Sequence, residues 1–212
     1  MLKVNEIFYS IQGESTFAGL PCVFVRLTYC NLRCSYCDTE YAFYEGKDMS
    51  INEILGEVKN YNCNLVEVTG GEPLFQKESF ELLTKLCDLG YTVLLETSGS
   101  ISIENVDKRV IIIMDLKTPS SKMEKKNKYS NINYLKPNDE VKFVIGDRND
   151  YEWAKNIINI YNLTSKCKVL MGVVFNELSN LDLAKWILED KLNVRFQIQL
   201  HKYIWSSEMK GV

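Results

Sequence analysis

The sequence is poor in the residues that mark fibrous, disordered and membrane proteins. Only four of its 212 residues are proline and 11 are glycine, too few for a disordered or fibrous chain. No apolar run reaches the roughly 20 residues that span a bilayer, and the N-terminus becomes polar too early for a signal peptide. Basic residues do not exceed acidic ones (25 against 28, net charge −3), which argues against a nucleic-acid or membrane-surface binder. We therefore expect one cytoplasmic domain over residues 1–212, with no nucleic-acid or membrane partner.

Cysteine is the residue type whose number stands out. The chain has seven, and an odd count leaves one thiol outside any simple disulfide framework. Three of them fall within eight residues, at Cys30, Cys34 and Cys37. Cysteine is among the most buried residue types, so we expect the other four to be packing residues. These four are Cys22, Cys63, Cys87 and Cys167.

Short apolar runs alternate with helical patterns along most of the chain. A near-continuous apolar run at 110–114 indicates strands covered on both faces, hence a parallel sheet. Right-handed strand–helix units curl such a sheet, and only four helices are clear. We therefore predict an α/β fold: a partial, open barrel of mainly parallel strands, with its active site at their carboxyl ends. The predicted strands are Val4–Ser10, Cys22–Thr28, Leu65–Thr69, Tyr91–Glu96, Val110–Leu116, Glu140–Ile145, Lys168–Phe175 and Asn193–His201.

The four helices are predicted from apolar residues at helical spacing. Ser50 opens the first with a capping box, and Gly90 stops the second. The other two lie at about Asn149–Tyr161 and Ser179–Lys191. The segment Pro119–Asp139 holds five lysines and shows little periodicity. We interpret it as a solvated surface excursion, with a lid as the alternative.

The cysteine triplet follows a predicted strand, at the edge where parallel α/β folds build their sites. Spacings of three and two residues let one loop bring three thiolates to one centre. A structural zinc site would need a fourth ligand from a second cysteine pair or from histidines, and none is visible. A cubic iron–sulfur cluster normally takes four cysteines, so three leave one iron open to a small molecule. The triplet therefore favours an open cluster site over chance clustering of buried cysteines.

The pattern C-x3-C-x2-C at 30–37, with Tyr36 before the third cysteine, resembles the cluster motif of radical S-adenosylmethionine enzymes. The resemblance implies a [4Fe-4S] cluster and reductive cleavage of S-adenosylmethionine to a 5′-deoxyadenosyl radical. The sequence TGGEP at 69–73 resembles the superfamily's glycine-rich motif, which contacts the methionine amino group. Two glycines after a strand let the backbone approach a ligand closely, although a tight turn alone would explain them too.

Further segments resemble the 7-carboxy-7-deazaguanine synthase family of that superfamily. They are QGE at 12–14, CDT at 37–39, TGGEP at 69–73, ETSG at 96–99 and LHK at 200–202. The resemblance implies ring contraction of 6-carboxy-5,6,7,8-tetrahydropterin to 7-carboxy-7-deazaguanine with loss of ammonia, in queuosine biosynthesis. It also implies recycled S-adenosylmethionine, Mg²⁺, an external one-electron reductant such as flavodoxin or ferredoxin, and a homodimer.

The resemblance assigns roles residue by residue. Carboxylate and amide groups would bind the amino-pyrimidinone edge of the pterin, and an arginine fork would bind its carboxylate, with a plain salt bridge as the alternative for that arginine. The substrate set is Gln12, Gly13, Glu14, Arg26, Thr69 and His201. The S-adenosylmethionine set is Tyr36, Cys37, Asp38, Gly70, Gly71, Ser98, Asp115 and Lys117. Cys30, Cys34 and Cys37 would hold the cluster, and Thr39 would bind Mg²⁺.

Alternation along the predicted strands independently favours a polar interior. Arg26 lies on the face opposite Val23 and Val25, and Lys142 shares a face with Glu140. Polar groups on strands covered on both faces need partners, so a barrel of this kind is expected to enclose a polar ligand. A wet face of an antiparallel sheet is the alternative.

Two features depart from the family pattern. A Gln-Pro segment that the family often has is replaced by LMGVVF at 170–175, and the chain continues past LHK to Val212, whose role we leave open. The rival interpretations are a glycyl-radical-enzyme activase with a protein substrate, an iron–sulfur electron carrier, and a structural zinc module.

Overall fold

The computed structural model describes residues 1–206 and 209–211. Within them, nine strands form one sheet in the order β3-β1-β2-β4-β5-β6-β7-β8-β9. Neighbouring strands from β2 to β9 run parallel, whereas β1 pairs antiparallel with β2 and β3. The strands are β1 (Leu2–Ile11), β2 (Pro21–Leu27), β3 (Lys47–Met49), β4 (Leu65–Gly70), β5 (Thr92–Thr97), β6 (Ile111–Asp115), β7 (Glu140–Ile145), β8 (Lys168–Val173) and β9 (Arg195–Phe196).

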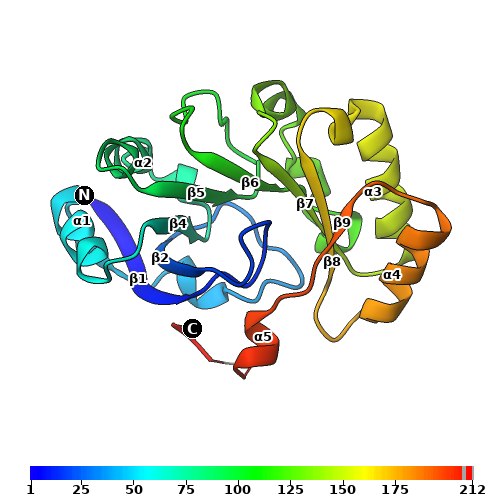
Figure 1. Ribbon diagram of the computed structural model, residues 1–212, viewed down its shortest axis with the longest axis horizontal. Coiled ribbons are helices and arrows are strands. Elements are labelled where there is room, and N and C mark those ends of the chain that lie inside the picture. Colours follow the sequence, from blue (N-terminus) through cyan, green and yellow to red (C-terminus); the bar gives the residue numbers. More distant parts are fainter. Residues whose placement is uncertain (207–208, 212) are drawn as a thin grey trace.

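The sheet bends into an open arc with its helices on the outside (Figure 1). The first two helices lie at one side of the arc and the next two at the other, while α5 lies near the gap between the ends of the sheet. This arrangement confirms the predicted partial, open barrel of mainly parallel strands. The helices are α1 (Ile51–Asn60), α2 (Ser79–Asp88), α3 (Arg148–Tyr161), α4 (Asn180–Glu189) and α5 (His201–Ile204).

Apolar residues divide into two cores, one on each face of the sheet. The large core fills the space between strands and helices, and Val23 and Val25 of β2 belong to it. The small core lies on the opposite face and includes Phe8 and Phe24, whose rings stack with centroids 4.9 Å apart. The alternation along β2 is therefore confirmed, and the inner face carries an apolar cluster beneath a polar region.

The helix ends follow the chemistry of their capping residues. Ser50 and Glu53 form the predicted capping box at the start of α1. The Asp147 carboxylate accepts a hydrogen bond from the Asp150 amide at the start of α3. Gly90 has φ +86 just after α2, the left-handed conformation that glycine adopts without strain. These contacts explain why the helix boundaries agree closely with those predicted.

The last predicted strand is wrong over most of its length. Asn193–His201 contains only the two-residue strand β9, and His201 begins α5 instead of ending a strand. The backbone leaves β8 because the Leu200 amide donates to the carbonyl of Gly13, which belongs to the β1–β2 loop. The prediction also missed β3, which is only three residues long and pairs with β1.

The segment Pro119–Asp139 is more ordered than a solvated excursion. It forms three 3₁₀ helices, Pro119–Ser121, Glu124–Lys126 and Tyr129–Tyr134. Asn131 is fully buried and donates hydrogen bonds to the carbonyls of Gly99 and Ile101. Its lysine-rich part remains exposed, so the segment combines a buried anchor with a charged surface.

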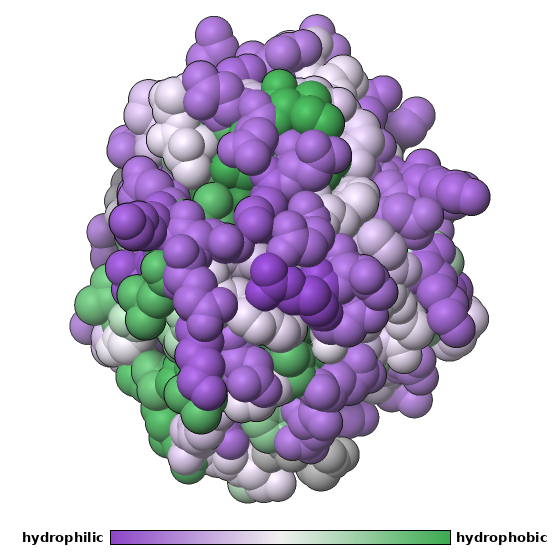
Figure 2. Space-filling model, turned by 90° about the vertical axis from the view of Figure 1, so that its right-hand side faces the viewer, coloured by the Kyte–Doolittle hydropathy of each residue, from purple (hydrophilic) through white to green (hydrophobic). Residues whose placement is uncertain are grey.

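The face that carries α3 and α4 is mostly hydrophilic, with apolar atoms in small separate groups (Figure 2). Its exposed large apolar side chains include Ile160, Leu181 and Leu188. Among the described helices, none is long and apolar enough to cross a membrane. All seven cysteines are free thiols, and two of the four scattered ones, Cys22 and Cys167, are buried in the cores as expected.

Candidate active site

A cavity of about 700 Å³ lies inside the arc, at the carboxyl ends of the parallel strands. Phe8 and Phe24 of the small core form part of its lining. Every site residue predicted from the sequence lies on its wall, and the structure thus brings together residues that are 189 positions apart along the chain. These residues are Gln12, Gly13, Glu14, Arg26, Cys30, Cys34, Tyr36, Cys37, Asp38, Thr39, Thr69, Gly70, Gly71, Ser98, Asp115, Lys117 and His201.

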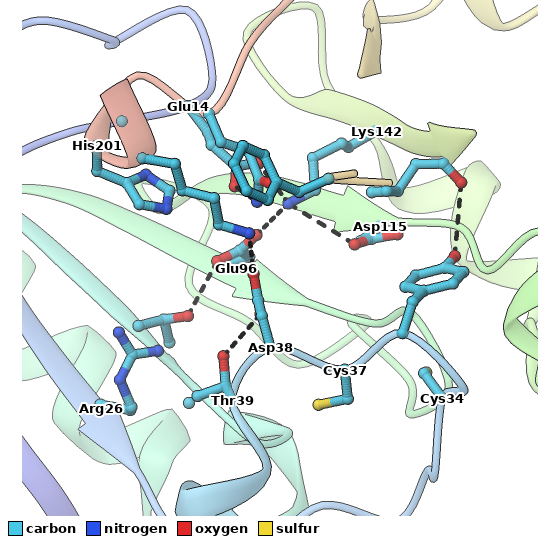
Figure 3. Close-up of a pocket in the computed structure, with 18 of the residues that line it drawn as sticks. Glu14, Arg26, Cys34, Cys37, Asp38, Thr39, Glu96, Asp115, Lys142 and His201 are labelled. Atoms are coloured by element: carbon cyan, nitrogen blue, oxygen red, sulfur yellow. Dashed lines mark hydrogen bonds and ion pairs between the residues drawn. The ribbon is translucent and has the colours of Figure 1, made fainter. Parts of the chain in front are cut away.

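The three clustered cysteines lie on one side of this cavity, on the loop after β2. In Figure 3, Cys34 and Cys37 occupy the lower part of the view, below Glu14 and Lys142. The Leu32 amide donates to Cys30 Sγ over 3.4 Å. Burial raises the pKa of all three thiols, that of Cys34 to about 11, while the nearby ammonium of Lys117 acts in the opposite direction.

The glycine-rich motif places backbone close to the cysteine loop. A Cβ on Gly71 would lie 2.2 Å from the Tyr29 carbonyl oxygen and 2.9 Å from Cys30 Cβ, so only glycine fits. The next residue, Glu72, is fully buried and accepts hydrogen bonds from the Ser98 amide (2.8 Å) and from its hydroxyl (2.6 Å). The carboxylate therefore fixes the loop after β5 against the loop after β4, and it orients Ser98 beside the cavity.

A charged network fills the other side of the cavity. The Lys142 ammonium donates to Glu14 Oε2 (2.9 Å) and Glu96 Oε1 (2.5 Å), and it lies 3.7 Å from Asp115 Oδ2 (Figure 3). Burial alone would lower the pKa of Lys142, but these carboxylates hold it well above its ordinary value. Burial acts to raise the pKa of Glu96, yet the ammonium of Lys142 keeps it below its ordinary value.

Beside this network lies a carboxyl group whose pKa is shifted in the opposite direction. Glu67 is 3% exposed and receives a 2.5 Å hydrogen bond from Gln12 Nε2. Burial and the neighbouring Glu96 raise the pKa of Glu67 well above its ordinary value. The pKa values of Glu67 and Glu96 are thus shifted in opposite directions, although both side chains face the same interior.

The protein partners of Arg26 bind its Nε and leave its two Nη atoms available to a ligand. Its Nε donates to Glu6 Oε1 over 2.7 Å, and the Tyr41 hydroxyl donates to the same oxygen. Within the described residues, the two Nη atoms donate no hydrogen bond to the protein. The salt bridge that the sequence left as an alternative is therefore present, and it fixes the guanidinium in the cavity wall without using all its donors.

His201 reaches the cavity through close packing with the β1–β2 loop. A Cβ on Gly13 would lie 2.1 Å from His201 Nδ1, so the imidazole packs directly against this glycine and would have to move for any side chain there. Burial lowers the pKa of His201, and the carboxylate of Glu14 acts in the opposite direction. The neighbouring Lys202 donates to Asp38 Oδ2 over 2.9 Å.

In Figure 3, Asp38 lies between Cys37 and Glu96, and Thr39 lies beside Asp38. The Thr39 hydroxyl donates to Asp38 Oδ1 over 3.0 Å. Burial acts to raise the pKa of Asp38, but the Lys202 ammonium beside it holds it well below its ordinary range. The two side chains present oxygen atoms to the cavity, which suits a hard cation that keeps other ligands.

Asp115 and Lys117 extend from the end of β6. Lys117 Nζ donates to Asp115 Oδ2 over 3.0 Å, while Asp115 Oδ1 is buried without a hydrogen-bond partner among the described residues. Tyr36 lies beside them, and its hydroxyl is 3.2 Å from the Thr118 hydroxyl. An unpaired buried carboxylate oxygen costs free energy unless a further group binds it, so this part of the wall is suited to a polar ligand.

The residues present fit an iron–sulfur cluster and S-adenosylmethionine. Among the described residues, no three His, Cys, Asp or Glu side chains converge closely enough to hold a single metal ion. Three cysteines from one loop nevertheless line one side of the cavity, and thiolates are the ligands that iron–sulfur clusters take. The orphaned Asp115 oxygen and the close backbone approach at Gly71 provide contacts for a neighbouring polar molecule.

The cavity wall also includes residues that were not among the predicted site residues. Four of them interact with predicted residues or with each other: Glu67, Glu96, Lys142 and Gln199. In the sequence each is a polar residue within an otherwise apolar strand or next to one. This pattern predicts that the side chain faces the interior, but it does not predict what the side chain does. Glu72 belongs to the recognised motif, but only the structure reveals that it holds Ser98.

Comparison with known proteins defines the class first. The Radical SAM superfamily profile matches residues 25–180, which is more than half of the chain. The fold agrees with this, because QueE from Escherichia coli superposes with a TM-score of 0.70 over 92% of both chains, at 19% identity. SuiB from Streptococcus suis bound to S-adenosylmethionine superposes with a TM-score of 0.57 over 80% of this chain and 45% of that one, at 15% identity. The protein is therefore a radical S-adenosylmethionine enzyme.

Curated relatives narrow the class to one family. The chain is 48% identical to the 7-carboxy-7-deazaguanine synthase of Chlorobaculum tepidum, over 100% of this chain and 97% of that one. It is 43% identical to the synthase of Koribacter versatilis over the full length of both. The chain belongs to the 7-carboxy-7-deazaguanine synthase family, which confirms the resemblance seen in its motifs.

Proposed function

We propose that this chain converts 6-carboxy-5,6,7,8-tetrahydropterin to 7-carboxy-7-deazaguanine with release of ammonia, as a step of queuosine biosynthesis. The observation that carries the proposal is that the Glu14 carboxylate and the Arg26 fork line the same cavity as the three cysteines. A carboxylate suits the guanidine-like edge of a pterin, and an arginine fork suits its carboxylate. Full-length similarity to curated synthases supports this choice of substrate.

The pterin edge is assigned to the β1–β2 loop. Glu14 accepts from Lys142 and Gln199, so the protein already fixes the position of its two oxygens. Gln12 Oε1 accepts a hydrogen bond from the Glu14 backbone amide over 2.9 Å, which orients the Gln12 side chain against the same loop. Both side chains are thus oriented before substrate arrives, which reduces the entropy lost on binding.

The substrate carboxylate is assigned to Arg26. Its Nε is occupied by Glu6, so the free Nη edge would donate to the carboxylate. Thr69 and His201 are assigned contacts with the same substrate; the Thr69 hydroxyl at present donates to Glu96 Oε2 over 3.0 Å. These residues come from β2, β4 and α5, and their convergence would hold one face of the ring system in a single orientation.

The cofactor end is assigned to the cysteine loop and the ends of β4 to β6. When bound, a [4Fe-4S] cluster with S-adenosylmethionine supplies the 5′-deoxyadenosyl radical that abstracts hydrogen from C6 of the pterin. Cys30, Cys34 and Cys37 would hold the cluster. Tyr36, Asp38, Gly70, Gly71, Ser98, Asp115 and Lys117 would bind S-adenosylmethionine, and Thr39 would bind Mg²⁺ beside Asp38. The cavity walls would shield the radical from solvent.

The test is turnover by reconstituted protein. The chain is purified anaerobically and given iron, sulfide, S-adenosylmethionine, Mg²⁺, dithionite and the carboxytetrahydropterin. We expect substrate-dependent 7-carboxy-7-deazaguanine and one equivalent of ammonia, detected by mass spectrometry and an ammonia assay. A protein with a confirmed cluster that cleaves S-adenosylmethionine without forming this product would sink the assignment. Omitting Mg²⁺ tests the role of Thr39.

Arg26→Ala sharpens the test at one residue. We expect the variant to keep its cluster and to raise the KM for the pterin by about tenfold to a hundredfold, because a charge-assisted bidentate contact is lost. Arg195→Ala is the matched control, since Arg195 is an exposed arginine of β9 outside the cavity. An unchanged KM in Arg26→Ala would remove the carboxylate role.

The remaining assignments concern the assembly and surroundings of the enzyme. We propose a cytoplasmic homodimer that takes its electron from an external reductant, as the family resemblance implies. Sedimentation of the holoprotein tests the dimer. Val212, whose carboxylate was left open as a substrate contact, lies outside the described residues.

A further inference from the structure

A cluster of lysines lies directly beside the cysteine loop, and the mechanism above does not use it. The segment 122–128 reads KMEKKNK, so it holds four lysines and one glutamate in a chain whose net charge is −3. The four lysines are exposed, and none of them takes part in an ion pair among the described residues. We name Lys122, Lys125, Lys126 and Lys128 the lysine patch.

The patch is tied to the cysteine loop by hydrogen bonds. The Ser35 amide, between Cys34 and Cys37, donates to the carbonyl of Ser121, and the Ser35 hydroxyl donates to the carbonyl of Ser120 over 2.6 Å. Ser121 directly precedes the first lysine of the patch. The charges are therefore held against the outer side of the loop whose thiols face the cavity.

The other end of the patch is fixed equally well. The Lys128 amide donates to the carbonyl of Gly99, in the loop that also carries Ser98. Asn127 exchanges two hydrogen bonds of 2.9 Å with the backbone of Lys117. A lysine-rich run held at both ends differs from a mobile charged tail, because its charges keep a fixed place relative to the cysteines.

A fifth cation belongs to the cysteine loop itself. Arg33 is exposed, its guanidinium stacks 4.2 Å from the Phe43 ring centroid, and its Nη1 donates to the carbonyls of Cys30 and Leu32. This arrangement leaves the cation on the outside of the loop while it stiffens the backbone between the first two cysteines. Arg33 is thus a further positive charge on the outside of the cysteine loop, two positions before Ser35.

We propose that the lysine patch and Arg33 form the docking surface for an acidic one-electron donor protein, which binds outside the cysteine loop. The inference rests on the proposed function, because cleavage of S-adenosylmethionine needs one electron from outside. The donor's reduced cofactor is oxidised by one electron and the cluster is reduced by one, so no atom is transferred. Opposite charges steer such short-lived encounters, and redox complexes bury little surface, so long-range charge contributes much of their recognition.

A donor protein on the lysine patch is better placed for electron transfer than one at the opening of the cavity. The cavity has to admit the pterin and S-adenosylmethionine, whereas the outer side of the cysteine loop carries no assigned ligand. A donor on this surface would approach the cluster ligands without displacing a substrate. Among other classes of macromolecule, an RNA also favours positive charge, and the experiment below separates it from a protein donor.

The test compares two triple variants that remove the same charge. Lys122→Gln, Lys125→Gln and Lys126→Gln are combined in the patch variant, and Lys59→Gln, Lys166→Gln and Lys185→Gln, all exposed and distant in sequence, are combined in the control. An acidic flavodoxin serves as the probe. We expect the patch variant to weaken its binding to the holoenzyme by about tenfold at low salt, and the control by less than about twofold.

Two readouts keep this proposal separate from the proposed function. Binding is measured by calorimetry at two salt concentrations, and cluster reduction is followed by loss of absorbance with flavodoxin hydroquinone or dithionite. We expect the patch variant to lose rate with flavodoxin alone and to match the wild type with dithionite. Equal losses in both variants, or binding of a duplex RNA that exceeds binding of flavodoxin, would overturn the docking surface. Absence of product with dithionite would instead overturn the proposed function.

Discussion

The two sides of the cavity are built in different ways. On the charged side, side chains from the β1–β2 loop, β5 and β7 hold each other directly, with Lys142 between Glu14 and Glu96. On the cysteine side, the Ser35 amide and hydroxyl donate hydrogen bonds to the carbonyls of Ser121 and Ser120, which hold the loop from outside, and the thiols face the cavity. Ion pairs between its own side chains hold the charged side together, whereas hydrogen bonds to a neighbouring segment hold the cysteine loop in place.

The difference follows from what each side is proposed to hold. A substrate that binds and leaves is held best by side chains that are oriented before it arrives. An internal ion network orients them, although removing its charges from water costs free energy. A resident cluster forms bonds to the thiolates, so the backbone of the loop has only to bring the three thiolates to the cluster. The two sides should therefore respond differently to mutation. Substitutions on the charged side should lower the stability of the fold, and substitutions on the cysteine side should lower the cluster content.

The largest effect is expected on the cysteine side. Cys34→Ala should lower turnover to below about a thousandth of the wild-type value, because one cluster ligand is lost. The apoprotein should unfold at nearly the same urea concentration, since the thiol is only half-buried and has no hydrogen bond among the described residues. Iron content, visible absorbance and product formation are measured on the reconstituted variant.

The control for this prediction is a scattered cysteine. Cys87→Ala, on α2 and remote from the cavity, should keep cluster and activity. If Cys34→Ala destabilised the apoprotein more than it changed iron content, the cysteine side would depend on packing, and the contrast between the two sides would be wrong.

The next effect is expected on the charged side. Lys142→Met leaves Glu14 and Glu96 without their common cation, and we expect the apoprotein to lose about 3 kcal/mol of stability. The value is at the lower end of the range for buried pairs because the Glu96 side chain is 30% exposed to the cavity. Urea unfolding of the apoprotein measures it, and Lys142→Arg, which keeps the charge, is the control.

The stability that Lys142 contributes should depend on pH in one direction. Lys142 holds the pKa of Glu96 below its ordinary value, so the pair stabilises the fold above the pKa of an unfolded glutamate. The stabilisation disappears as the pH falls through the folded pKa. The gap between wild type and Lys142→Met should therefore narrow in acid; a gap independent of pH would mean that packing of the lysine stem, and not its charge, stabilises this side.

The sequence predicted the cysteine side more completely than the charged side, and the reason is physical. Cys30, Cys34 and Cys37 are close together in the chain, so one loop determines their placement. Gly71 and Ser98 follow strands, and adjacent parallel strands end at one edge of a sheet. The strand pattern and the motifs together therefore sufficed to place all predicted site residues around one cavity.

The charged network depends on contacts that no local pattern contains. Lys142 is a lone basic residue on a strand, and only the arc of the sheet brings it to Glu14, 128 positions earlier. The final strand was mispredicted for a similar reason. An alternating pattern suggested that His201 ends a strand, but its packing on Gly13 and the Leu200–Gly13 hydrogen bond place it in a helix. Tertiary contact overrode local propensity there.

The smallest effect concerns Glu67, which separates the charged side from the apolar core. Burial and Glu96 raise its folded pKa, so the native protein keeps a proton that the unfolded chain releases. Stability from this group is complete below the unfolded pKa and is lost as the pH rises toward the folded one. Glu67→Gln mimics the protonated form and still accepts from Gln12, so it should escape this loss.

The expected result is a difference that grows with pH. The free energy of unfolding of the Glu67→Gln apoprotein should rise relative to that of the wild type as the pH increases from 4.5 to 7.5, by about 1.4 kcal/mol for each unit by which the folded pKa of Glu67 exceeds the unfolded one. Urea unfolding at three pH values measures the gain, and Glu189→Gln, on the exposed surface of α4, controls for the loss of one carboxylate. Parallel stability curves for Glu67→Gln and wild type would mean that Glu67 ionises in the native protein. The charged side would then carry one more negative charge, and Lys142 and Lys117 together would have to offset Glu14, Glu96 and Asp115 with Glu67 beside them.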